Sequence, residues 1–315
     1  MTAGPAAPAG PAAPAVPAPA GAPVPYRGAT GVSTCFGTFG ELLQGMLPEP
    51  DADFLVTLPV ARWTMSTFRV EPGRTGVEVR PAHKGKARRM AEMVLAAAGA
   101  PGGGLLTVDS SLPEGKGMAS SSADLVATAR AVANAVGLDL PPARLEDLLR
   151  RIEPTDGVLY PGVVAFDHRR VRLRARLGSL PTMTVVGLDE GGTVDTVAFN
   201  RIAKPYTAAD RREYAGLLAR LTRAVAGRDL AEVGAVATRS AELNQALWPK
   251  RTLGEVLRVC EQVGALGVVA AHSGTMLGVL LDPADPRYVE RISATVRACS
   301  RISPDVSLYR SLSFD

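Results

Sequence analysis

The feature that most constrains the fold is the segment 111–124, SLPEGKGMASSSAD, which joins an expected strand at residues 105–111 to an expected helix at residues 120–136. Gly115 and Gly117 can take positive φ angles and let the backbone approach a ligand closely. The three serines bring hydroxyl and unpaired N–H groups to a helix start, where the helix dipole is positive. The segment therefore predicts an anion-binding turn suited to phosphate groups.

The residues of this turn also allow other interpretations. Lys116 adds a mobile cation, and a serine hydroxyl can hold a divalent metal that bridges phosphates, whereas the plain alternative is a helix N-cap on a glycine turn. The P-loop pattern is absent because Gly117 follows Lys116. The dinucleotide fingerprint has Ser120 in place of its third glycine, and the HRR at residues 168–170 lacks the aspartate of the protein-kinase H-R-D motif.

The chain alternates between expected strands and helices from residue 26 onward. Short apolar or β-branched runs between turn residues predict strands at residues 56–60, 63–70, 77–80, 105–111, 163–167, 171–177, 182–188, 267–271, 275–281 and 305–310. Apolar residues at helical spacing predict helices at residues 84–98, 120–136, 208–226, 229–247, 251–264 and 286–300, and one that starts at Pro142. This order predicts an α+β protein of two domains, with the break near residues 180–200.

Composition excludes several classes of protein. The chain has 315 residues, 46% of them hydrophobic, so it can bury a core and is neither a disulfide-stapled miniprotein nor wholly disordered. A net charge of +4 is too small to indicate nucleic acid, and no run of about 18 apolar residues predicts a membrane span. Cys35, Cys260 and Cys299 are widely spaced without a histidine at ligand spacing, which indicates neither a disulfide framework nor zinc and favours a reducing cytoplasm.

Residues 1–25 differ from the rest of the chain. They contain eight Pro, ten Ala and three Gly and no charged side chain. Such a segment cannot bury enough surface to offset its ordering entropy, so a disordered tail is predicted. A signal peptide is not expected, because there is no basic start and proline interrupts the apolar run.

Two carboxylates, Glu153 and Asp156, stand three residues apart where an expected helix runs into a turn. The helix dipole favours cations at a C-terminus, so a binding role would explain two acids there. The alternative is a solvated turn in which Asp156 bonds to its own backbone. The basic residues Lys84, Lys86, Arg88 and Arg89 are interpreted as the solvated face of the helix that follows.

Three segments together carry a family resemblance. Residues 113–123, PEGKGMASSSA, resemble the ATP loop of the GHMP kinases, the superfamily of galactokinase, homoserine kinase, mevalonate kinase and phosphomevalonate kinase. Residues 36–45, FGTFGELLQG, resemble its N-terminal motif, and residues 271–278, AHSGTMLG, its glycine-rich third motif. Within the superfamily, GELxQG, EPTDG, FDH and AHSGT are similar to the L-threonine kinases of cobalamin synthesis. The order CFGTF at residues 35–39 departs from the common pattern at the front of the first motif.

The resemblance implies an α+β, two-domain GHMP kinase fold. The N-terminal domain, residues 26–190, would be related to ribosomal protein S5 domain 2 and would bind ATP, and the C-terminal domain, residues 191–315, would be ferredoxin-like. The implied reaction is phosphoryl transfer from ATP, with Mg²⁺, to the hydroxyl of a small molecule, L-threonine or a related hydroxy amino acid. The resemblance implies no nucleic acid or membrane partner, and a homodimer is compatible with it.

The resemblance also assigns roles to residues of this chain. The implied ATP-binding residues are Pro113, Gly115, Lys116, Gly117, Met118, Ala119, Ser120, Ser121, Ser122, Ser273 and Gly274. The implied Mg²⁺ ligands are Ser122 and Glu153, the implied substrate residues are Glu41, Gln44 and Arg201, and the implied catalytic residues are Asp156, Lys116 and Thr196.

Several of these roles have competing interpretations. Asp156 would accept the proton of the acceptor hydroxyl or only orient that hydroxyl. Arg201 could clamp a substrate carboxylate or be a surface arginine, and Glu41 and Gln44 could be ordinary turn residues. His272 is expected to be a positioned, hydrogen-bonded loop residue rather than a base. Other acceptors, such as homoserine, serine or a specialised metabolite, stay open, as does a non-catalytic ATP-binding regulator.

Overall fold

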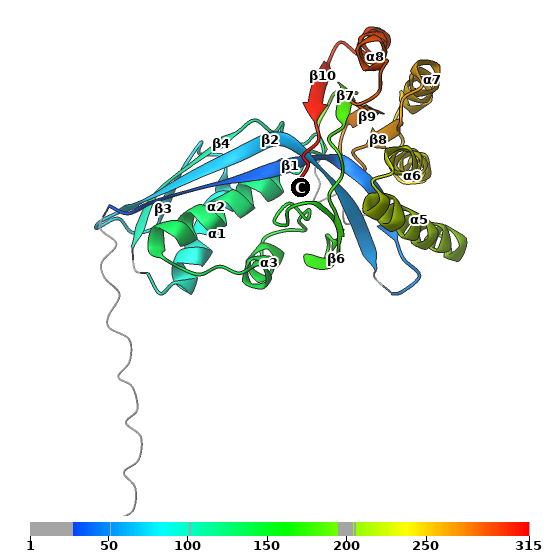
Figure 1. Ribbon diagram of the computed structural model, residues 1–315. Coiled ribbons are helices and arrows are strands. Elements are labelled where there is room, and N and C mark those ends of the chain that lie inside the picture. Colours follow the sequence, from blue (N-terminus) through cyan, green and yellow to red (C-terminus); the bar gives the residue numbers. More distant parts are fainter. Residues whose placement is uncertain (1–27, 51, 101, 195–203, 205, 315) are drawn as a thin grey trace, which may run out of the picture.

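The computed structural model describes residues 28–50, 52–100, 102–194, 204 and 206–314. Two long antiparallel strands, β1 (Thr30–Met46) and β2 (Asp53–Glu71), run through the middle of the molecule (Figure 1). At one end of β2 lie β4 (Gly103–Ser110), which is antiparallel to β2, and β3 (Val77–Arg80), which is parallel to β4. At its other end β2 pairs with β5 (Val163–Asp167), which pairs with β6 (Arg172–Gly178).

Three helices lie on the same side of this part of the sheet: α1 (Gly85–Ala97), α2 (Ser120–Val136) and α3 (Pro142–Arg150) (Figure 1). The central one, α2, is buried along most of its length, because small and apolar side chains cover nearly its whole circumference. It ends at Gly137, which takes the left-handed conformation typical of a helix C-cap. The strong helical signal of residues 120–136 thus places one rigid helix directly behind the turn at residues 113–119.

The C-terminal strands extend the same sheet in the order β10-β7-β9-β8, and β8 meets β1 through the pair Glu41 and Ala270. These strands are β7 (Thr184–Asp189), β8 (Gly267–Ala270), β9 (Met276–Leu281) and β10 (Val306–Arg310). The helices of this half are α5 (Ala208–Gly227), α6 (Leu230–Leu243), η1 (Asn244–Ala246), α7 (Leu253–Val263) and α8 (Tyr288–Ile302). Among the described helices, none has the length and apolar character needed to cross a membrane.

The α+β class is confirmed, and most expected elements appear within a few residues of their expected bounds. Since β7 pairs with β9 and β10, a boundary drawn by strand pairing would lie before Thr184. The boundary at residues 190/191 stays a prediction.

Two expectations about the central strands are wrong. Residues 56–60 and 63–70 form one strand, β2, because the residues between them bulge: Phe36 pairs with Trp63 and Gly37 with Val60. The strand β1 was not expected at all. From Cys35 to its end β1 is buried on both faces, so it lacks the alternation of apolar and polar residues that marks a half-buried strand.

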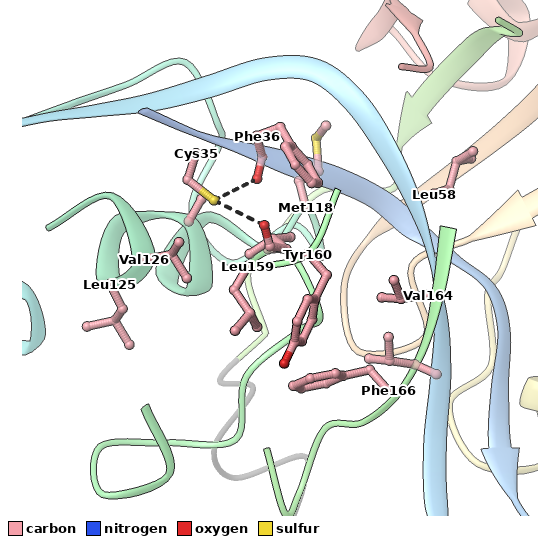
Figure 2. Close-up of a cluster of buried hydrophobic side chains, with 14 of the residues drawn as sticks. Cys35, Phe36, Leu58, Met118, Leu125, Val126, Leu159, Tyr160, Val164 and Phe166 are labelled. Carbon is pink, nitrogen blue, oxygen red and sulfur yellow. Dashed lines mark hydrogen bonds between the residues drawn. The ribbon is translucent and has the colours of Figure 1, made fainter. Parts of the chain in front are cut away.

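Cys35, on β1, is buried in the apolar core, to which Val126 of α2 also belongs (Figure 2). Its thiol donates to the carbonyls of Phe36 and Val158 at 3.4 and 3.5 Å. Burial raises the pKa of this thiol to about 12. A thiol that stays protonated is a poor nucleophile, so Cys35 acts as a packing residue.

Candidate functional site

A cavity of about 330 Å³ lies at the N-terminus of α2. It is lined by residues from every segment that the sequence analysis singled out within the described chain. These residues are Glu41, Gln44, Gly115, Gly117, Met118, Ala119, Ser120, Ser121, Ser122, Glu153, Asp156 and Ser273. The fold thus gathers at one place segments that are far apart in the sequence.

Residues 113–119, here called the Gly115 loop, are held from outside by four backbone hydrogen bonds, one of which joins the Gly115 carbonyl to the N–H of Val194 at 3.1 Å. The carbonyls of Lys116, Gly117 and Met118 accept from the N–H groups of Thr275, Gly40 and Thr38, at 3.2, 3.1 and 3.3 Å. In a planar trans peptide the N–H points opposite to the carbonyl. The N–H groups that follow these three carbonyls therefore point away from β1 and from residues 271–275.

The start of α2 is open to an anion. Within the described residues, the N–H groups of residues 117–121 have no hydrogen-bond partner, and α2 has neither a capping side chain nor an acid in its first turn. Ala119 and Gly117 have positive φ angles, 57° and 84°. At a helix start, such aligned N–H groups and the positive end of the dipole favour phosphate.

The turn at residues 271–275, here called the His272 turn, packs directly on the Gly115 loop. A Cβ atom added to Gly117 would lie 2.4 Å from the Cβ of Ala271, and one added to Gly274 would lie 2.1 Å from the carbonyl oxygen of Lys116. Real Cβ atoms essentially never come that close. Both glycines are therefore needed for the two backbones to touch.

The two carboxylates after α3 face the serines of α2. Ser121 donates its hydroxyl hydrogen bond to Glu153, and the hydroxyl of Ser122 donates to Asp156 Oδ2 at 3.3 Å while it accepts from the Asp156 N–H at 3.1 Å. Burial, reinforced by the negative charge of Glu41, raises the pKa of Asp156 to about 7. Asp156 can therefore gain or lose a proton near neutral pH, as a general base requires.

Glu41 and Gln44 lie at another part of the cavity wall, on β1. One carboxylate oxygen of Glu41 accepts from the backbone N–H and from Nδ1 of His272, at 2.9 and 2.8 Å. The Nε2 of His272 bonds to the hydroxyl of Ser240 at 2.8 Å, and that hydroxyl accepts from the Gln44 N–H at 3.2 Å. His272 is thus fixed on both ring nitrogens, as expected for a positioning residue.

The Gln44 side chain is only 5% exposed, and its carbonyl oxygen Oε1 has no hydrogen-bond partner among the described residues. Gln44 lines the cavity. A buried carbonyl oxygen without a donor is costly, so it is suited to a ligand that brings an N–H or O–H group.

The interpretation of the basic residues as a solvated face is wrong for Lys84, whereas the side chain of Lys86 is 53% exposed, as expected. Both line the cavity: Lys84 is 11% exposed and pairs with Asp124 at 2.6 Å and with Glu114, and Lys86 pairs with Glu153. Although burial opposes it, hydrogen bonds to Asp124 and Glu114 raise the pKa of Lys84. One signal could have revealed these lysines, because cations at a helix start oppose the dipole and need another reason to be there.

Five of the expected site residues do not line the cavity or cannot be placed. Lys116 does not line the cavity; its ammonium pairs with Asp189 Oδ2 at 2.5 Å and donates to the carbonyl of Gly192 at 2.6 Å. Pro113 and Gly274 belong to the two touching backbones but are not among the lining residues. Thr196 and Arg201 lie outside the described residues.

The donors present fit Mg²⁺, which binds oxygen ligands and is commonly held by one or two carboxylates together with substrate phosphates. Ser122, Glu153 and Asp156 supply a hydroxyl and two carboxylates on one cavity wall. Glu153 already has a cation, the Lys86 ammonium, as its partner. No cluster of three or more His, Cys, Asp and Glu side chains that could hold a metal is found in the described part of the chain.

Comparison with known proteins identifies the family. The family described as GHMP kinases N terminal domain matches residues 85–160. An L-threonine kinase of Citrobacter freundii is 30% identical over 256 residues, which cover 80% of this chain and 86% of the relative. An L-threonine kinase of Salmonella typhimurium is 31% identical over 259 residues, covering 80% and 83%.

Solved structures share the fold. The homoserine kinase of Cytophaga hutchinsonii superposes with a TM-score of 0.70 at 16% identity, covering 90% of this chain and 95% of the other. The mevalonate kinase of L. major, solved with R-mevalonate, has a TM-score of 0.69 at 16% identity, covering 93% and 99%. At such identities the likeness concerns the fold, which is the one the sequence motifs predict.

Proposed function

The chain belongs to the GHMP kinases, and we propose that it transfers the γ-phosphate of ATP to the hydroxyl of L-threonine, giving O-phospho-L-threonine. The observation that carries this proposal is the meeting of an anion-binding loop and a half-buried carboxylate with a raised pKa, Asp156, in one cavity. The sequence identity of 30% and 31% with two L-threonine kinases supports the choice of acceptor. On the resemblance to such enzymes, the product would serve cobalamin synthesis.

Phosphoryl transfer needs positioning and charge stabilisation more than covalent chemistry. The unpaired N–H groups of residues 117–121 would bind the phosphates. Asp156, held against Ser122, would orient the acceptor hydroxyl and take its proton. Ser122 and Glu153 would hold Mg²⁺, which supplies positive charge to the phosphate oxygens when bound.

An amino-acid acceptor carries an ammonium and a carboxylate besides its hydroxyl. The carboxylate of Glu41 and the unpartnered Oε1 of Gln44 are suited to the ammonium. Arg201 stays the proposed partner of the substrate carboxylate, and Thr196 a proposed substrate-side hydroxyl. Homoserine and serine carry the same three groups, so the choice among them depends on the shape of the acceptor site.

The proposal is tested by incubating the protein with Mg-ATP and, separately, with L-threonine, L-serine, L-homoserine and alcohols that are not amino acids. The phosphorylated product is then identified by mass. We expect O-phospho-L-threonine as the main product, with the highest kcat/KM for L-threonine. If another alcohol is the main phosphorylated product, that alcohol replaces L-threonine as the assigned acceptor. If no ADP is released with any acceptor, the result favours a non-catalytic ATP-binding regulator.

A further inference from the structure

Lys250 is a buried cation that the reaction described above does not use. Lys250 is 3% exposed and lies between η1 and α7. Its backbone is fixed by Gln245, whose side chain accepts from the Lys250 N–H at 2.7 Å and donates to the Lys250 carbonyl at 3.1 Å. Its ammonium donates to the carbonyl of Gly274 in the His272 turn.

No carboxylate pairs directly with this ammonium among the described residues. The charged groups that act on it from a distance are Glu41 on β1 and Asp189 and Glu190 at the end of β7. Taking an ammonium out of water without a paired carboxylate is costly, and an apolar side chain of similar size is often as good or better for stability. Stability alone is therefore a poor reason for a lysine at this position.

A chain of two peptide units connects Lys250 to the cavity. The carbonyl of Gly274 points to the ammonium, so the N–H of the same peptide, that of Thr275, points the opposite way, where it donates to the carbonyl of Lys116 at 3.2 Å. By the same geometry the N–H of Gly117 points away from the His272 turn. Gly117 lines the cavity, so the chain ends at a phosphate-binding N–H.

We propose that Lys250 is a positioning residue for the triphosphate: its ammonium fixes and polarises the Gly274–Thr275 peptide, which in turn holds the Gly117 N–H in place. Its charge also lies behind the loop that receives the negative phosphates. The inference rests on the proposed function only in taking the Gly115 loop as the triphosphate site. It requires no particular acceptor.

The charge of Lys250 is open to titration. Burial lowers the pKa of its ammonium to about 8, although Glu190, Glu41 and Asp189 oppose this shift. Below pH 8 the group is charged, and as pH rises through 8 it becomes neutral. We therefore expect the affinity of the free protein for nucleotide to fall above about pH 8. Arginine keeps its charge throughout this range, so Lys250→Arg should remove the fall.

The experiment measures the dissociation constant of AMP-PNP with Mg²⁺ by calorimetry, from pH 7 to pH 9.5, for the wild-type protein and three variants. At pH 7 we expect Lys250→Met to raise it about tenfold to a hundredfold, the range for hydrogen bonds to charged groups. Lys250→Arg should recover most of the loss. The matched control is Arg251→Met, which removes the same charge from the exposed neighbouring residue, and it should bind as the wild type does.

Thermal unfolding of each variant separates positioning from folding, because a positioning role predicts an unchanged or higher unfolding temperature for Lys250→Met. Wild-type affinity in Lys250→Met, or a wild-type dissociation constant that is flat from pH 7 to pH 9.5, overturns the inference. If Lys250→Met unfolds, the pH profile of the wild type decides alone. A wild-type protein that does not bind AMP-PNP at all contradicts the proposed function itself.

Discussion

Replacing Asp156 with asparagine is expected to lower kcat by about 10²- to 10⁴-fold, the usual contribution of a positioned proton acceptor. Asparagine has nearly the same shape and can keep the hydrogen bonds with Ser122, but it cannot take the proton of the acceptor hydroxyl. Because burial works against the charged form of Asp156, its removal should leave the unfolding temperature unchanged or raise it. The measurement is kcat at saturating Mg-ATP and acceptor.

Asp147→Asn provides the control for this prediction. Asp147 lies on the neighbouring helix α3, its side chain is 70% exposed, and its one ion pair within the described part of the chain is with Arg150, at 2.5 Å. Its loss removes the same charge without touching the cavity, so kcat should stay at the wild-type value. Unchanged turnover in Asp156→Asn would remove Asp156 from the proton-accepting role and leave it at most an orienting group.

The second large effect is expected from Gly274→Ala. The new Cβ would lie 2.1 Å from the carbonyl oxygen of Lys116 and 2.5 Å from the nitrogen of Gly117, both backbone atoms that cannot rotate away. The Gly115 loop and the His272 turn must then separate by about 1 Å, and a displacement of this size at a site that positions reactants can cost about 10² in rate. We expect kcat/KM for ATP to fall by about this factor.

Gly254→Ala is the matched control, since the same methyl group at Gly254 in α7 meets no atom within 4 Å. It should leave kcat/KM unchanged and stabilise the protein by about 0.4–1 kcal/mol, because alanine restricts the unfolded chain more than glycine does. Wild-type kcat/KM in Gly274→Ala would mean that contact between the loop and the turn does not set the phosphate site.

Local pattern predicted the elements whose signal lies within a few residues. Residues 120–136 have apolar residues at helical spacing and a glycine stop, and they form α2 with those bounds. The strand β1 has no such local signal, because its burial comes from elements distant in sequence that cover both faces. The bulge in β2 likewise depends on its register with β1, which no single segment encodes.

The site divides in the same way. Glu41, Ser122, Glu153 and Asp156 could be named from motifs, and the structure brings all four to one cavity. The proposed role of Lys250 could not be predicted from motifs, because it depends on a contact with Gly274, which is 24 residues away in the sequence.

The pattern of charged residues predicted the location of side chains less well than the motifs did. Lys84 looked like part of a solvated helix face, yet it is held by Asp124, 40 residues away, at 2.6 Å. A basic cluster at a helix start gives no local sign of which of its members will meet a buried acid. Lys116 was expected to contact the phosphates, but its ammonium pairs with Asp189, the last residue of β7.

The most direct test of the central claim is a crystal structure of the protein with AMP-PNP and Mg²⁺. The account predicts that the β- and γ-phosphate oxygens accept hydrogen bonds from N–H groups of residues 117–121 at the start of α2. A triphosphate bound in another part of the molecule, or a Gly115 loop whose N–H groups are capped by the protein's own side chains, would contradict it.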